Sequence, residues 1–139
     1  LYKQASELPN VNYIGYRPNE YILENLQNYH IFAYPSIWEE TSCISAIECM
    51  SAGLYSIVTN YGALYETCSE FPIYVQYLED YKLLAQSFAS AIDIAADTLH
   101  LDVIQNNLDM QQDFYKRFYS WEKQASTWSN FLQGVTHVK

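Results

Sequence analysis

Short apolar segments alternate with helical patterns over most of this chain, and that alternation limits the folds it can adopt. Four segments share the length and the apolar, β-branched or aromatic content of buried strands: 11–16, 31–35, 55–59 and 73–77. Apolar residues at helical spacing follow each of them, over 19–29, from about 42 to 53, over 62–68 and over 79–97. Buried strands joined by helices predict an α/β fold, a Rossmann-like parallel sheet with helices on both faces.

The remaining residues, 99–134, predict at least one more helix and a break, with Ser120 capping a last helix. A length of 139 residues suits one domain. Four strands are few for a doubly wound sheet, and the chain opens at Leu1 rather than at a methionine. We therefore interpret residues 1–139 as a single, incomplete domain that lacks its first strands.

The net charge of −9 restricts the partners of the chain. Such a charge repels nucleic-acid phosphates and anionic membrane surfaces. No apolar run reaches the roughly 18–20 residues that a membrane span needs. The three cysteines, Cys43, Cys49 and Cys68, have apolar neighbours, which is typical of reduced core thiols. These features predict a cytoplasmic protein with no transmembrane segment and no nucleic-acid partner.

Several common catalytic and binding motifs are missing from the sequence. It contains neither G-x-G-x-x-G nor G-x-x-x-x-G-K, the glycine-rich motifs that bind phosphates, and no serine in a G-x-S-x-G nucleophile elbow. Its three histidines are scattered, and no Cys/His spacing matches a zinc site. We therefore expect no metal site, no resident cofactor and no triad hydrolysis.

The stretch WEETSCISAIECMSAG, at 38–53, places a lone acid, Glu48, in an apolar helix. An unpaired carboxylate in a buried position costs roughly several kcal/mol unless a group donates to it. One interpretation is structural. Glu48 would meet a Lys or Arg from another helix, and Glu39 and Glu40 would be solvated charges that favour the helix N-terminus.

The other interpretation is a ligand site. A helix that follows a parallel strand has its N-terminus at the crevice above the carboxyl ends of the strands. Free amides from Thr41 to Ile44 would bind a phosphate or diphosphate. Glu48, one to two turns further on, would accept hydrogen bonds from a ribose diol. Glu40 would accept from hydroxyls on the far side of the diphosphate.

Further features of the same region have a fixed order along the chain. They are Pro35-Ser36, Glu40 and Glu48 with seven residues between them, Ala52-Gly53, the strand 55–59, and Gly62 with Glu66. Downstream, YKRFYSWEKQASTW supplies a Tyr-Ser-Trp element on the closing helix. The chain thereby resembles the C-terminal, nucleotide-sugar donor domain of retaining GT-B glycosyltransferases, group 1 (family 4). The resemblance spans nearly the whole chain.

The resemblance implies a role for each matched residue. Glu48 would hold the ribose hydroxyls, and Glu40, as the catalytic residue, would contact the donor sugar and help position its anomeric carbon. The other implied donor contacts are the amides of Thr41, Ser42, Cys43 and Ile44 at the diphosphate and sugar, Tyr16 and Arg17 near the base, and Glu66 on the cleft loop. Thr41-Ser42-Cys43 stands where the family usually has Gly-Phe-Gly.

The reaction implied by the resemblance moves a hexose-like sugar from a nucleoside diphosphate to a hydroxyl of a glycan, lipid or protein, with retention and without a required metal. The nucleoside-diphosphate sugar is then a substrate, not a resident cofactor. The family's diphosphate-binding cations and acceptor domain would precede Leu1, so the isolated segment is expected to be inactive. Three alternatives stay open: a non-catalytic nucleotide-sugar binder, an α/β protein-interaction module, and a GT-B epimerase or phosphorylase.

Overall fold

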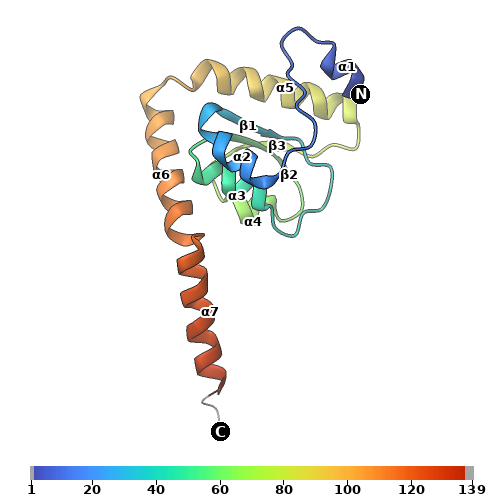
Figure 1. The fold of residues 1–139 in the computed structure, drawn as a ribbon. Coiled ribbons are helices and arrows are strands. Elements are labelled where there is room, and N and C mark those ends of the chain that lie inside the picture. Colours follow the sequence, from blue (N-terminus) through green and yellow to red (C-terminus); the bar gives the residue numbers. More distant parts are fainter. Residues whose placement is uncertain (1, 137–139) are drawn as a thin grey trace.

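A three-stranded parallel sheet forms the centre of the fold (Figure 1). The computed structural model describes residues 2–136. The strands are β1 (Ile31–Tyr34), β2 (Tyr55–Asn60) and β3 (Ile73–Gln76), in the order β1-β2-β3. Tyr34 lies opposite Val58 and Val58 opposite Tyr74, so the carboxyl ends of all three strands lie along one edge.

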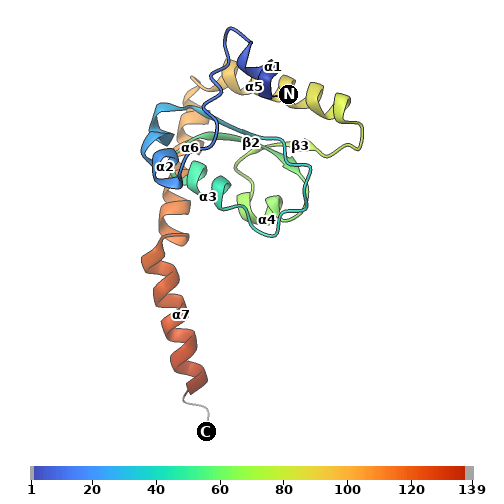
Figure 2. The same cartoon turned by 45° about the vertical axis from the view of Figure 1, so that its right-hand side comes forward.

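Helices cover both faces of this sheet, which confirms the predicted Rossmann-like class (Figures 1 and 2). α3 (Ile44–Ser51) and α4 (Leu64–Cys68) lie on one face, and α5 (Tyr81–Thr98) lies on the other. Alternate residues of a strand point to opposite faces, so neighbouring residues of β2 enter different cores. The core under α5 contains Ile57, Val75, Leu84, Phe88, Ala91 and Ala95, and the core under α3 and α4 contains Val58, Ala46, Met50, Leu64, Cys68 and Tyr115.

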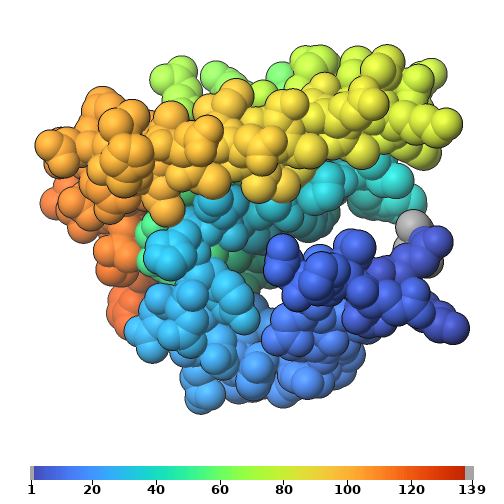
Figure 3. Space-filling view, turned by 90° about the horizontal axis from the view of Figure 1, so that it is seen from above, coloured from blue at the N-terminus to red at the C-terminus, as the bar shows by residue number. Residues whose placement is uncertain are grey.

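The strand expected at 11–16 is not formed. This segment is irregular and connects α1 (Tyr2–Ser6) with α2 (Asn19–Asn25) and the 3-10 turn η1 (Leu26–Asn28). Val11 and Tyr13 are 43% and 49% exposed, so the apolar pattern does not produce a buried face here. In Figure 3 a hollow separates the first residues, in dark blue, from α5. Within residues 2–136, β1 therefore pairs with β2 alone.

Two helices end the described chain, α6 (Asp102–Phe118) and α7 (Trp121–Thr136). The amide of Lys123 donates to Ser120 Oγ at 3.3 Å, which confirms the expected cap at the break. α6 packs on α3, where its buried Gln111 donates from Nε2 to the carbonyls of Met50 and Leu54 at 3.2 and 3.0 Å. α7 buries none of its residues and extends away from the sheet (Figure 1). No helix among the described residues is both long and apolar enough to cross a membrane.

Candidate functional site

The loop from β1 to α3 crosses the carboxyl edge of the sheet and carries four of the nine predicted site residues, Glu40, Thr41, Ser42 and Cys43. Thr41 and Ser42 are exposed in this loop, and Cys43 is the N-cap of α3. The helix thus begins at Ile44, one or two residues later than expected. Its first hydrogen bond runs from the Ile47 amide to the Cys43 carbonyl at 3.2 Å. The amides of the first turn therefore precede the helical hydrogen-bond ladder and remain oriented for an anion.

Glu40 is half-buried in this loop and is held by a tyrosine. Tyr34, the last residue of β1, donates from its hydroxyl to Glu40 Oε1 at 2.5 Å. This hydrogen bond, together with burial, raises the pKa of Tyr34 well above its ordinary value. The phenol therefore stays protonated and remains a donor at neutral pH. The carboxylate of Glu40 thus has one oxygen fixed by a neutral group.

The backbone of Glu40 is held by the loop that follows β2. The amide of Ala63 donates to the Glu40 carbonyl at 2.8 Å. Gly62 has φ +56°, and a Cβ at this position would lie 2.7 Å from the Glu40 nitrogen and 2.9 Å from its oxygen. Any side chain at position 62 would collide with that backbone. The glycine is therefore needed for both its left-handed conformation and its close approach.

Two further side-chain contacts join the same pair of loops. The Thr59 hydroxyl, buried at the end of β2, donates to the Ser36 carbonyl at 2.7 Å. The Tyr61 hydroxyl donates to Glu39 Oε1 at 3.3 Å. The loops after β1 and β2 therefore form one hydrogen-bonded unit, and Glu40 lies within it.

Glu48 lies just over one turn into α3 and is half-buried. Asn19, the first residue of α2, donates from Nδ2 to Glu48 Oε1 at 3.3 Å. Within residues 2–136 the side-chain donor to this carboxylate is thus an amide, not the Lys or Arg of the structural interpretation. The group is paired with a neutral partner at the surface of the helix, which leaves acceptor capacity for a ligand.

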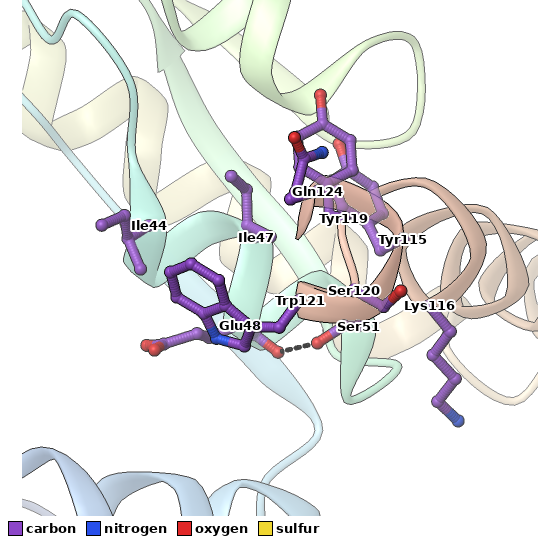
Figure 4. Close-up of a pocket in the computed structure, with 10 residues that line it drawn as sticks. All are labelled: Ile44, Ile47, Glu48, Ser51, Tyr115, Lys116, Tyr119, Ser120, Trp121 and Gln124. Atoms are coloured by element: carbon purple, nitrogen blue, oxygen red, sulfur yellow. Dashed lines mark hydrogen bonds between the residues drawn. The ribbon is translucent and has the colours of Figure 1, made fainter. Parts of the chain in front are cut away.

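A cavity of about 410 Å³ adjoins Glu48, between α3 and the α6–α7 break (Figure 4). Ile44, Ile47 and Trp121 line it beside the acid. In Figure 4 the indole of Trp121 lies close to Glu48, whereas the Lys116 side chain extends away from the carboxylate. The cavity therefore combines apolar and aromatic walls with one anionic and one cationic side chain, Glu48 and Lys116.

The remaining predicted residues lie on the surface. Tyr16 is 90% exposed, and Arg17 is exposed with its guanidinium 5.6 Å from the centroid of the Tyr21 ring. Both residues lie shortly before Asn19, the residue that donates to the Glu48 carboxylate. Glu66 is exposed in the first turn of α4. Within residues 2–136 its side chain makes no hydrogen bond to Glu40 or to Glu48.

Sequence reasoning missed Tyr34 and Asn19, the two groups that donate to the acids. A hydroxyl at the end of an otherwise apolar strand, directly before Pro35-Ser36, was a usable signal for Tyr34. Asn19 is 29 positions from Glu48, and nothing in the sequence links the two residues. For Trp121 the sequence indicates only a place in the Tyr-Ser-Trp element of the closing helix, not a place in the cavity beside Glu48. A search of residues 2–136 finds no group of three or more His, Cys, Asp or Glu arranged to hold a metal ion.

The family comparison covers the sheet and the candidate site together. The sequence model described as "Glycosyl transferases group 1" matches residues 1–107, which include all three strands, Glu40, Glu48 and α5. Neither a curated protein nor a solved structure shows significant similarity to the chain. A family match of this extent, over the segment that forms the parallel sheet, identifies the chain as a member of the group 1 glycosyl transferases.

Proposed function

We propose that this chain binds the nucleoside-diphosphate sugar of a retaining GT-B glycosyltransferase of family 4. The family implies transfer of a sugar from a donor to an acceptor. The observation that carries the proposal is the pair of carboxylates beside the first turn of α3. Each carboxylate accepts from a neutral donor, Glu40 from Tyr34 and Glu48 from Asn19. A carboxylate that accepts from one donor has acceptor sites left for ligand hydroxyls.

The proposed donor lies along the N-terminal end of α3. Glu48 accepts from the ribose hydroxyls, and Glu40 accepts from hydroxyls of the sugar and helps position its anomeric carbon. Other proposed contacts are the amides of Thr41, Ser42, Cys43 and Ile44 for the diphosphate and sugar, Tyr16 and Arg17 for the base, and Glu66 at the cleft. Transfer breaks the bond between the anomeric carbon and the diphosphate oxygen and forms one to the acceptor oxygen, and the proton of the acceptor hydroxyl passes to the departing diphosphate. Backbone amides then stabilise the leaving diphosphate.

Transfer needs more than this donor site. A diphosphate requires cations to offset its charge, and the net charge of this chain is −9. We propose that the cations and the acceptor site belong to a further domain of the same protein, so that the isolated chain binds donor without turnover. A non-catalytic binder would share the donor site, and an epimerase or phosphorylase would share the fold. Assay of the complete protein for sugar transfer to a hydroxyl acceptor separates the transferase from all three alternatives.

Substitution of Glu48 tests the donor site. We expect Glu48→Gln to weaken binding of UDP, GDP or ADP, and of the corresponding nucleotide sugars, by about 1–3 kcal/mol, the range for losing hydrogen bonds to a charged group. Titration calorimetry on the complete protein measures this loss, with UDP-glucose, GDP-mannose and ADP-glucose as probes.

The matched control is Asp93→Asn, which removes one exposed carboxylate from α5 on the other face of the sheet. Its affinities should equal those of the wild type. Unchanged affinity in Glu48→Gln would refute the ribose assignment. If the wild type bound none of the probes, the proposal that this chain holds the donor would fail.

A further inference from the structure

Both the backbone and the carboxylate of Glu40 are held by neighbouring residues, and a single residue holds the carboxylate. Its backbone is held by Ala63 and by the close approach of Gly62. Its carboxylate is held through Oε1 by the hydroxyl of Tyr34. The backbone contacts place the residue at the edge of the sheet, but they do not set the rotation of the carboxylate. The Tyr34 hydrogen bond does.

Tyr34 is itself a rigid support. As the last residue of β1 it is paired with Val58 in the parallel ladder. Its ring stacks on Phe32 with a centroid separation of 5.5 Å. A phenol can donate one hydrogen bond, and here that bond goes to Glu40, so the donor and the acceptor orient one another. A carboxylate has about four lone-pair sites, so the second oxygen remains free to accept from a ligand.

We infer that Tyr34 is a positioning residue for recognition of the donor's sugar, acting through Glu40 without contact between the phenol and the sugar. This inference rests on the proposed donor site, in which Glu40 contacts the sugar and Glu48 contacts the nucleoside. The two parts of the donor are therefore recognised by separate acids, each oriented by its own neutral partner. Loss of the Tyr34 hydroxyl should affect the sugar part alone.

Tyr34→Phe removes the hydroxyl and keeps the ring that packs on Phe32. We expect it to weaken binding of the nucleotide sugar that the wild type prefers by about 3–10-fold, as for one hydrogen bond. Affinity for the nucleoside diphosphate without sugar should stay the same. Titration calorimetry with UDP-glucose against UDP, or GDP-mannose against GDP, measures both affinities on the same protein.

Tyr74→Phe is the matched control. Tyr74 lies in the same row and on the same face of the sheet, opposite Val58 from the other side, and its hydroxyl donates to the Ser69 carbonyl. This variant loses a tyrosine hydrogen bond of the sheet but not the one to Glu40. Both of its affinities should match those of the wild type.

A double-mutant cycle separates positioning from a general structural effect. In the Glu40→Ala background, which has no acceptor for the Tyr34 hydroxyl, Tyr34→Phe should produce a much smaller further loss of sugar-nucleotide affinity than in the wild type. An equal loss in both backgrounds would overturn the inference, and so would an equal loss for nucleotide sugar and nucleoside diphosphate. Unchanged nucleotide-sugar affinity in Tyr34→Phe would also overturn the inference. If the proposed donor site itself is wrong, the wild-type titrations reveal it before any variant is measured, because the wild type then binds none of the probes.

Discussion

Gly62 and Glu40 belong to different loops, and their backbones meet at the carboxyl edge of the sheet. The contact needs a residue that adopts φ +56° and has no Cβ. The position of an acid on one loop is therefore determined by a glycine on the next loop. The sequence marks both residues, but it does not show that they touch.

Gly62→Ala tests this contact. The left-handed conformation alone costs an L-residue about 1–2 kcal/mol, and displacement of the Glu40 backbone adds to that loss. We expect the free energy of unfolding, measured by urea denaturation, to fall by more than this amount, and nucleotide-sugar affinity to fall with it.

Gly15→Ala provides the comparison. Gly15 has a similar φ of +65°, but apart from its chain neighbours no atom of the described residues lies within 4 Å of a Cβ built there. This variant should lose no more than the conformational contribution and should keep donor affinity. Equal stability losses in the two variants would show that the close approach to Glu40 contributes nothing.

At the scale of the secondary-structure elements, α3 has two roles. One side of it is packed against the sheet and α6, where Ala46 and Met50 are fully buried. On another side, Ile44 and Ile47 of its first turn and Glu48 line the cavity. The buried side therefore holds the helix in the orientation that the cavity side needs.

Met50→Ala should weaken the fold through α3. Loss of a fully buried methionine typically costs about 2–5 kcal/mol, because a cavity remains. The same substitution at Met110, which is 65% exposed on α6, should change the free energy of unfolding by less than about 0.5 kcal/mol. Urea denaturation of the two variants measures the difference, and comparable losses would contradict the packing of α3 described above.

Periodicity in the sequence predicted the elements that bury an apolar face. The expected strands at 31–35, 55–59 and 73–77 and the helix at 79–97 agree with the structure to within a few residues. The segment 11–16 has a similar composition, yet it finds no partner among residues 2–136. A strand is stabilised by its neighbour in the sheet, and the neighbour is a tertiary property that local pattern does not contain.

The candidate site shows the same limit. Spacing on one helix and its preceding loop was enough to select Glu40 and Glu48 as ligand-binding candidates. Their partners come from elsewhere, Tyr34 from a strand and Asn19 from the start of another helix. Such pairs follow from the packing of separate elements. The sequence offers a signal for Tyr34 at the end of its strand, but the contact with Glu40 and the whole of the Asn19 contact appear only in the folded chain.

For the molecule as a whole, the expected reduced core thiols are present, since all three cysteines are free and buried. Burial raises the pKa of Cys49 and of Cys68 to about 12. In the unfolded chain these thiols ionise near their ordinary pKa of 9.0. Between these values the unfolded state releases protons that the folded state retains, so stability is complete below the lower pKa and falls as pH rises toward the upper one.

We expect the free energy of unfolding to decrease by about 1.4 kcal/mol per buried thiol for each pH unit above about 9. Urea denaturation between about pH 9 and 10 measures the slope. Tyrosines that ionise near pH 10 in the unfolded chain also contribute to it, because the pKa values of Tyr34, Tyr74 and Tyr115 are raised in the folded state, so the contribution of one thiol is read from the difference between two variants. Cys68→Ala should have the shallower slope, whatever its stability at neutral pH. An identical slope in that variant would show that this thiol does not stay protonated in the folded state.

The position of α7 has a mechanical consequence. The helix is joined to the rest of the structure at the break around Ser120, and its 16 residues are all unburied. The helix is about 24 Å long, so a rotation of about 10° at the break would move its far end by about 4 Å. Trp121 is next to the pivot and hardly moves, whereas Trp128 and Phe131 travel with the arm. A force applied to the distal aromatic residues can thus swing the helix while the wall of the cavity beside Glu48 stays in place.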